Sequence, residues 1–368
     1  MRRTHRLLAG LALVGLAVAG CGSPPASGGN QGQEGGGGGG GGASASSFKA
    51  CMVTDTGGID DRSFNASAWK GLKQAKQANP NLKIQYLQSQ SESDYVPNIN
   101  AFINQDCGLI VTVGFLMGDA TKNAAKQHKD QDFAIVDFKF DPPLDNVKGL
   151  VYNTAPAGML GGYLAAGLTK TGTVATYGGQ KIPGVTPYMD GFWDGVHYYN
   201  KKHGTDVKLL GWNRKTQNGT FVGSFTDKAK GKQVTETFMQ QGADIIFPVA
   251  GNVGLGTTAA VKQQGKGKVH VIWVDQPGCV SDPQECELFV ASVTKGIVAS
   301  VKQVSTKAAA SGNFEGGNYL GLLKNDGVDL VYGKKYESKI PSKLKSEIKQ
   351  LRKDIISGKV EAKTKGVA

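Results

Sequence analysis

The sequence TDTGGIDDRSFNASAWKG, from Thr54 to Gly71, places acidic, aromatic and amide side chains in one short segment. Its aspartates, Asp55, Asp60 and Asp61, could bind a metal ion or accept hydrogen bonds from a polar ligand. A calcium ion needs roughly six to eight oxygen ligands, and adjacent side chains diverge in an extended chain. We therefore expect Asp61 to open the helix that begins near Ser63 rather than to bind a metal.

Two Ser-Phe-polar sequences add a second kind of chemistry. Phe64 lies in RSFNAS, where Asn65 follows it, and Phe225 lies in GSFTDK. Taken alone, each phenylalanine is more often a core residue. If the two rings face each other across a cleft, they can stack on both faces of a flat heterocycle, and each such contact contributes about 1–3 kcal/mol.

Carboxylates end three apolar runs, at Asp55, Asp137 and Asp275. A single aspartate at such a place often caps the next helix or turn, but three at equivalent places indicate a binding site. Carboxylates accept hydrogen bonds from vicinal hydroxyls or from the N–H edge of a base. Ligands of open parallel sheets bind beyond the carboxyl ends of the strands, where Gly251 and Lys295 are also expected.

The glycine-rich segment Gly251–Gly256 (GNVGLG) follows an apolar run and opens a helical pattern. Its spacing does not match the G-x-G-x-x-G fingerprint of dinucleotide sites, and it has no G-K-[ST] sequence of a phosphate loop. We interpret it as a tight turn that lets backbone amides approach a sugar, with phosphate binding as the alternative.

The rest of the chain positions these residues through alternating elements. From Phe48, short apolar runs alternate with amphipathic stretches, from FKACMV to FAIVDF, and a second series runs from GTVATYG to VHVIWVD. This order predicts right-handed βαβ units, and hence an α/β protein with two doubly wound parallel-sheet lobes. We expect three connections, with the first lobe at 48–153 plus 277–322 and the second at 154–276 plus 323–358.

The N-terminus has the pattern of an export signal. Arginines precede an apolar run, Leu7–Val18, that is too short to span a bilayer, and the small residues before Cys21 resemble the lipobox of bacterial lipoproteins. We expect residues 1–20 to be a signal peptide and Cys21 to be lipidated; the alternative is a plain cleaved signal that leaves an odd thiol. Residues 21–47, rich in glycine and serine, are expected to form a flexible tether.

Four further cysteines suggest disulfides in an exported chain, and four cysteines allow three pairings. Cys279 and Cys286 bracket a short polar loop, whereas Cys51 and Cys107 begin strand-like runs and could meet if those strands are neighbours. No cysteine or histidine spacing suits zinc.

The formal net charge of the whole chain is +12. Many of the lysines lie among apolar positions of the last helical pattern, which favours a solvated helix face over a nucleic-acid surface. The run has no interleaved aromatic residues after Tyr336, so we expect no nucleic-acid partner.

Four motifs in order, TDTGGIDDRSFNASAWKGL, GSFTDKAKGKQVTETFMQQGADIIFPVAGNVGLG, VIWVDQ and SVTKGI, resemble those of the basic membrane protein family. That resemblance implies a substrate-binding lipoprotein of an ABC transporter, with the type I periplasmic-binding-protein fold and a multi-strand hinge. It further implies a purine nucleoside ligand, permease subunits as partners, and a palmitate-bearing lipid anchor on the extracytoplasmic face of the cell membrane. We expect a monomer without cofactor, metal or catalytic activity.

The resemblance also implies roles for single residues. The matching phenylalanines stack on the base, an aspartate and an asparagine contact its polar edge, and an aspartate, a lysine and a glycine region hold the ribose. The stacking residues are Phe64 and Phe225, and the residues at the polar edge of the base are Asp137 and Asn65. The residues that hold the ribose are Asp275, Lys295 and Gly251, and Asp55 also lines the site.

The chain departs from the family at Met159, where phenylalanine is common, and at Asn252, which replaces a glycine next to the ribose contact. Two alternatives therefore stay open. The same fold could bind a sugar or another small metabolite, or the protein could be a nucleoside hydrolase that uses Asp55, Asp60 and Asp61 around a calcium ion.

Overall fold

The computed structural model describes residues 48–265, 267–311 and 314–366. The predicted signal peptide, Cys21 and the predicted tether lie outside the described residues. The region Ser47–Ala368 forms one compact unit, and its strands belong to two large sheets and one short hairpin.

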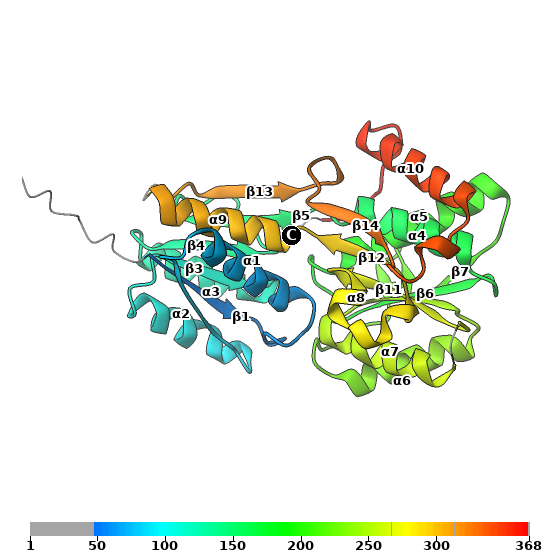
Figure 1. Ribbon diagram of the computed structural model, residues 1–368, viewed down its shortest axis with the longest axis horizontal. Helices are drawn as coiled ribbons and strands as arrows, with labels where there is room; N and C mark the ends of the chain where they lie inside the picture. The colour runs from blue at the N-terminus through cyan, green and yellow to red at the C-terminus, as the bar shows by residue number, and fades with distance from the viewer. Residues whose placement is uncertain (1–47, 266, 312–313, 367–368) are drawn as a thin grey trace, which may run out of the picture. The chain divides into compact units, whose positions relative to one another are not determined.

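The first sheet has the strand order β13-β5-β4-β3-β1-β2, and its strands pair in parallel. Helices cover both faces, α1 and α9 on one and α2 and α3 on the other (Figure 1). The bounds are β1 (Lys49–Thr54), α1 (Phe64–Ala78), β2 (Lys83–Leu87), α2 (Tyr95–Ile103), β3 (Leu109–Val113), α3 (Gly118–Gln127), β4 (Asp132–Val136), β5 (Val147–Tyr152), α9 (Ile297–Ser311) and β13 (Gly317–Gly321).

The second sheet has the order β14-β12-β11-β10-β6-β7, parallel except for β14, which runs antiparallel to β12. Helices α4, α5 and α10 cover one face, and α6 and α7 the other (Figure 1). The bounds are α4 (Ala155–Leu168), β6 (Thr173–Gly178), α5 (Thr186–His203), β7 (Lys208–Leu210), α6 (Lys228–Gln240), β10 (Ile245–Val249), α7 (Gly254–Gln263), β11 (His270–Asp275), α8 (Gly278–Ser281), β12 (Phe289–Lys295), β14 (Val328–Tyr332) and α10 (Ser342–Ile356).

Smaller elements connect these layers. A two-stranded hairpin, β8 (Trp212–Asn213) and β9 (Asn218–Gly219), follows β7. The short 3₁₀ helices are η1 (Glu92–Asp94), η2 (Phe115–Met117), η3 (Gly251–Val253), η4 (Pro283–Leu288), η5 (Leu323–Asn325) and η6 (Glu337–Lys339). Two of them, η2 and η3, directly follow strands and therefore shape the carboxyl ends of the sheets.

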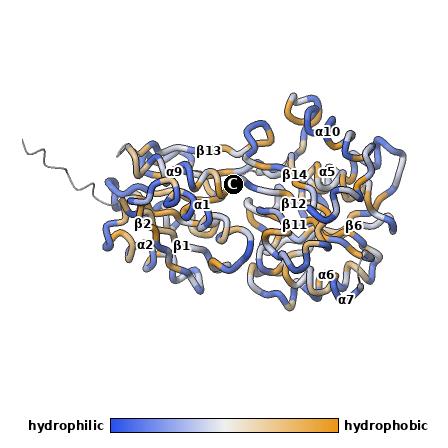
Figure 2. The backbone as a smooth tube through the Cα atoms, viewed as in Figure 1, coloured by the Kyte–Doolittle hydropathy of each residue, from blue (hydrophilic) through white to orange (hydrophobic). Residues whose placement is uncertain are grey.

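The central strands of both sheets are apolar, and helices bury both of their faces. In β3 (LIVTV) and β10 (IIFPV) every residue is buried, as is typical of parallel sheets covered on both sides. Helices such as α1 and α10, by contrast, alternate between hydrophilic and hydrophobic residues along their length (Figure 2), as expected for helices with one buried face.

Helix α4 is buried on almost all sides, and glycines allow α5 to approach it closely. A Cβ added at Gly191 would lie 1.9 Å from the carbonyl oxygen of Ala155, and one at Gly195 would lie 2.1 Å from that of Met159. Larger residues would separate the helices. Met159 itself is 2% exposed in this core and does not line the candidate site described below.

The predicted boundary between the lobes was wrong for residues 277–295. The strand β12 pairs with β11 in the second sheet, and α8 packs beside it, so the chain returns to the first lobe only after Lys295, with α9. The reason is that an apolar strand pattern does not specify which sheet the strand joins. We define lobe I as residues 48–153 plus 296–321 and lobe II as 154–295 plus 322–366; the chain crosses between them three times.

Each lobe contains one disulfide. Cys51 on β1 is bonded to Cys107, which precedes the neighbouring strand β3, and Cys279 is bonded to Cys286 in lobe II. Among the described residues, no helix is both long enough and apolar enough to cross a bilayer.

Candidate functional site

A pocket lies at the carboxyl ends of strands from both sheets. The space inside it that the centre of a water molecule can reach is about 60 Å³. The structure brings all eight predicted ligand-binding residues to its walls, namely Asp55, Phe64, Asn65, Asp137, Phe225, Gly251, Asp275 and Lys295.

Asp137 and Asp275 occupy equivalent places in the two lobes. Asp137 follows β4 and Asp275 ends β11, and each strand is third in its sheet. Both residues have positive φ, 63° and 67°, a left-handed conformation that aspartate tolerates better than most residues. The parallel strands therefore end in the same local geometry and aim both carboxylates into the pocket.

Lys295, at the end of β12, lies between these two carboxylates. Its Nζ is 2.5 Å from Oδ2 of Asp137 and 3.7 Å from Oδ1 of Asp275, and its side chain is only 3% exposed. Burial raises the pKa of Asp137 to about 6, because the loss of hydration outweighs the attraction of Lys295.

Asp275 is held in place by two hydroxyl groups. The hydroxyl of Tyr188 on α5 donates to its Oδ1 (2.9 Å), and Oγ of Ser63 donates to its Oδ2 (2.9 Å). Tyr188 is buried, and burial together with the nearby carboxylates raises the pKa of its phenol well above the ordinary value. Tyr188 therefore stays a hydrogen-bond donor to Asp275.

Asp61 organises the first turn of α1, as the sequence predicted. Its carboxylate accepts from the backbone N–H groups of Ser63 (2.9 Å), Asn65 (2.6 Å) and Ala66 (3.1 Å). Burial nevertheless raises its pKa to about 7. Asp60, the neighbouring residue, is exposed and does not line the pocket.

The amide of Asn65 has a defined direction. Its Nδ2 donates to Oδ1 of Asp55 (2.8 Å) and to Oδ2 of Asp61 (3.0 Å), whereas its Oδ1 is buried without a protein partner. The backbone N–H of Gly57 also donates to Asp55 (2.9 Å), and burial raises the pKa of Asp55. Asn65 consequently offers the pocket a hydrogen-bond acceptor rather than a donor.

Phe64 and Phe225 reach the pocket from different lobes. Phe64 is the first residue of α1 in lobe I, and its ring centroid lies 5.2 Å from Nζ of Lys295. Phe225 precedes α6 in lobe II and lies against Gly179, where an added Cβ would approach its ring to 2.4 Å. Glycine is required at Gly179 because any larger residue would displace the ring.

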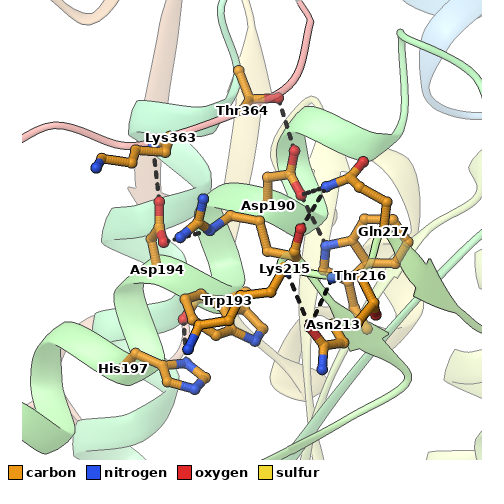
Figure 3. A network of polar contacts seen from close by, with 12 residues as sticks. Asp190, Trp193, Asp194, His197, Asn213, Lys215, Thr216, Gln217, Lys363 and Thr364 are labelled. Carbon is orange, nitrogen blue, oxygen red and sulfur yellow. Dashed lines mark hydrogen bonds and ion pairs between the residues drawn. The ribbon is translucent and has the colours of Figure 1, made fainter.

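Asp190 connects three parts of lobe II around the helix that carries Tyr188 (Figure 3). It is completely buried and accepts from Nε1 of Trp212 (3.0 Å), Nε2 of Gln217 (2.8 Å) and Oγ1 of Thr364 (2.8 Å). The β8–β9 hairpin and the C-terminal segment are thereby fastened to α5.

Asp194, one turn further along α5, strengthens the same junction. It forms an ion pair with Arg214 (2.8 Å) of the hairpin and accepts from the backbone N–H of Lys363 (2.7 Å) (Figure 3). The guanidinium of Arg214 lies 4.8 Å from the ring centroid of Trp193. The hairpin leads directly into the loop with Phe225, so this network supports one wall of the pocket.

Several lining residues were not predicted from the sequence. Ile182, Gly184 and Val185 come from the loop after β6, whose sequence QKIPGV contains apolar residues within a Gly/Pro turn. Apolar residues in a turn directly after a strand could have indicated a wall of the binding pocket. Gly184 is close to lobe I, since an added Cβ would lie 3.1 Å from Oδ2 of Asp137.

The described residues contain no group of three or more histidine, cysteine or acidic side chains arranged to hold a metal ion. The site instead combines three phenylalanines (Phe64, Phe115 and Phe225), four buried aspartates and one lysine. Such a pocket can stack a flat ring and accept several hydrogen bonds from a polar ligand.

Two-lobed folds with this architecture occur in solute-binding proteins. The crystal structure of ABC transporter system solute-binding proteins from Aeropyrum pernix K1 matches with a TM-score of 0.76 and 25% identity, over 85% of this chain and 92% of that one. A solute-binding protein from Bacillus halodurans with bound myo-inositol shares the fold at 14% identity and a TM-score of 0.56, over 81% and 98% of the chains. The fold is therefore that of the periplasmic binding proteins.

Sequence comparisons specify the family. The family described as "ABC transporter substrate-binding protein PnrA-like" matches residues 48–365. The chain is 32% identical to the ABC transporter nucleoside-binding protein BmpA of Lactococcus lactis over 99% of this chain and the whole relative. It is also 32% identical to the CD4+ T-cell-stimulating antigen of Listeria monocytogenes, over 87% and 89% of the two chains. The protein belongs to this Bmp family of ABC transporter substrate-binding proteins, as its motifs indicated.

Proposed function

We propose that the protein captures a purine nucleoside in the pocket between its lobes and delivers it to the permease of an ABC importer. The observation that carries this proposal is the pairing of Phe64 and Phe225, from opposite lobes, with buried carboxylates in one pocket. Aromatic side chains suit the faces of a base, and carboxylates suit hydroxyl and N–H donors. The nucleoside-binding name of the Lactococcus relative supports the same ligand class.

In this proposal the base lies against Phe64 and Phe225. Asp137 and the free Oδ1 of Asn65 accept hydrogen bonds from its polar edge. Because both N–H groups of the Asn65 amide already donate to aspartates, this residue accepts a hydrogen bond from a donor on the ligand.

In the same proposal Asp275, Lys295 and the backbone near Gly251 hold the ribose, and Asp55 also lines the pocket. Gly251 has φ of 53° and open space where a side chain would begin, so the backbone there is accessible to a hydroxyl group. The carboxylate of Asp275 is already oriented by Tyr188, which lowers the cost of ordering it on binding.

The proposal includes a membrane anchor. Cleavage before Cys21 and lipidation of that cysteine would hold the protein on the extracytoplasmic face of the cell membrane, and the tether at residues 21–47 would let a monomer reach its permease. A relative from Pyrococcus horikoshii is named a lipoprotein. Metabolic labelling with a palmitate analogue, compared between the native protein and Cys21→Ala, tests this part.

A thermal-shift series tests the ligand. A bound ligand stabilises the folded protein by RT ln(1 + [L]/Kd), so inosine, guanosine or adenosine should raise the unfolding temperature, and ribose and hypoxanthine should not. Phe64→Ala and Phe225→Ala should each weaken nucleoside binding by about tenfold or more, because each removes one stacking face. Tyr86→Ala, an exposed aromatic outside the pocket, is the matched control.

Two outcomes would reject this proposal. A shift with ribose and none with any nucleoside would show that the acceptor-rich pocket binds a sugar. Release of free hypoxanthine from inosine by the purified protein would identify a hydrolase instead.

A further inference from the structure

The lobes contact each other directly at a place outside the pocket. Gln276, which follows β11 in lobe II, donates its Nε2 to the backbone carbonyl of Arg62 in lobe I at 2.7 Å. The guanidinium of Arg62 in turn lies 3.8 Å from Oδ1 of Asp282 in lobe II. Both interactions span the two lobes.

A buried contact lies next to this pair. Oγ of Ser63 donates to Oδ2 of Asp275 (2.9 Å) and approaches the backbone carbonyl of Val274 (3.3 Å), and Ser63 is completely buried. Two successive residues of lobe I, Arg62 and Ser63, are thus bound to the segment 274–276 of lobe II.

The loop of lobe I is held in the shape that these contacts require. Arg62 has φ of 55°, in the left-handed region that favours glycine. The carboxylate of Asp61 accepts the N–H of the following residue, Ser63, at 2.9 Å. This arrangement directs the carbonyl of Arg62 toward Gln276 and the hydroxyl of Ser63 toward Asp275.

These residues lie outside the pocket. Arg62, Ser63 and Gln276 are absent from the pocket walls, and Arg62 and Gln276 line a separate groove with Lys70 and Lys73 of α1. They differ in this respect from Lys295 and Asp137, which link the lobes from within the pocket.

We propose that Gln276, together with the loop 61–63, forms a latch that stabilises the closed arrangement of the lobes and so sets how long a ligand stays bound. This inference rests on the proposed function. The contacts exist only when the lobes are together, so they favour the closed state over an open one without selecting any ligand. Weakening the latch should speed ligand release and leave capture by the open state unchanged.

Gln276 is the residue to test, because its neighbours are less informative. The side chain of Arg62 is 53% exposed, and exposed ion pairs contribute little. Ser63→Ala would leave an oxygen of Asp275, a pocket residue, without its donor. Gln276→Ala removes one hydrogen bond to a backbone carbonyl at the outer edge.

The experiment measures release of labelled inosine from the full chain after a chase with unlabelled inosine. One net hydrogen bond corresponds to about a threefold to tenfold faster dissociation in Gln276→Ala, with the association rate within about twofold of the wild type. Arg62→Ala, which keeps the backbone acceptor, should change dissociation by less than about twofold. Lys70→Ala, in the same groove, is the matched control and should not change it.

A second measurement separates the latch from the proposed function. Solution X-ray scattering of the ligand-free proteins should give a larger radius of gyration for Gln276→Ala than for the wild type. If the wild type binds inosine but Gln276→Ala releases it at the wild-type rate, the latch is wrong and the proposed function stands. If the wild type binds no nucleoside, the proposed function fails, and equal radii of gyration would then reject the latch as well.

Discussion

The two lobes repeat one framework with different chemistry. Strand by strand, β13-β5-β4-β3-β1-β2 corresponds to β14-β12-β11-β10-β6-β7. Only the edge strands β13 and β14 differ in direction, since β13 is parallel to its neighbour and β14 is antiparallel. Each lobe adds one of the two predicted stacking phenylalanines, Phe64 or Phe225, and one left-handed aspartate to the pocket. In these features the two lobes are equivalent.

The strand ends next to these aspartates differ. Where β1 is followed by Asp55, β6 is followed by Gly179, and where β5 is followed by Asn153, β12 ends in Lys295. Among the described residues that line the pocket, Lys295 is the one lysine or arginine. Lobe II therefore supplies the positive charge and lobe I most of the negative charge, so neither lobe alone forms a balanced site.

Among the substitutions that test this difference in charge between the lobes, the replacement of Lys295 should have the largest effect. Lys295→Met keeps the length of the side chain but leaves Asp137 and Asp275 without their shared cation. Removing one partner of a buried ion pair costs roughly 3–5 kcal/mol. We expect the free energy of unfolding, measured by urea titration, to fall by about this amount and inosine affinity to fall at least about a hundredfold.

The control for this variant is Lys262→Met, which removes a lysine that pairs with Glu285 but is 65% exposed. It should lower stability by less than about 1 kcal/mol. Wild-type inosine binding by Lys295→Met would contradict the asymmetry between the lobes.

The protonation of Asp137 predicts how the free energy of unfolding depends on pH, which gives a second test of the charge distribution in the pocket. The pKa of Asp137 is raised by burial from 3.8 to about 6, so the folded protein binds this proton more tightly than the unfolded chain does. The stability that the proton contributes is complete below about pH 4 and is lost as the pH rises through about 6. Asp137→Asn removes this pH dependence.

Urea titrations between pH 4 and pH 7 measure this effect. Over that interval the stability of Asp137→Asn relative to the wild type should rise by roughly 2–3 kcal/mol, since one pKa unit corresponds to about 1.4 kcal/mol. The exposed control Asp130→Asn should follow the wild type throughout. A constant difference between Asp137→Asn and the wild type would contradict a raised pKa.

Gly179→Ala should have a smaller effect. The added Cβ would meet the ring of Phe225 at 2.4 Å and displace it, and we expect inosine affinity, measured by calorimetry, to fall about tenfold, comparable to the loss of one stacking contact. In a Phe225→Ala background the same substitution should cost nothing further, because the ring it displaces is gone. An additional loss in that background would show that Gly179 acts by another route.

Residues at strand ends could be predicted from the sequence, because alternating strands and helices place them at the same edge of a parallel sheet. Asp55, Asp137, Asp275 and Lys295 all follow or end apolar runs, and the structure brings them to one pocket. Phe64 and Phe225 were predicted from their matching sequence contexts and from the family motifs.

Other features depend on tertiary contacts that no local pattern records. The pattern of β12 shows a buried strand but not which sheet it joins, and the bond from Tyr188 to Asp275 depends on how α5 packs on the second sheet. The direction of the Asn65 amide likewise follows from two aspartates that surround it only in the folded chain.

The two disulfides lie within single lobes. The Cys51–Cys107 bond joins strands of lobe I, and the Cys279–Cys286 bond closes a loop of lobe II. Neither of these bonds, which are those found in the described residues, ties one lobe to the other. Disulfide formation can therefore stiffen each half as a separate body, while the freedom to open and close is left to three backbone crossings and reversible polar contacts.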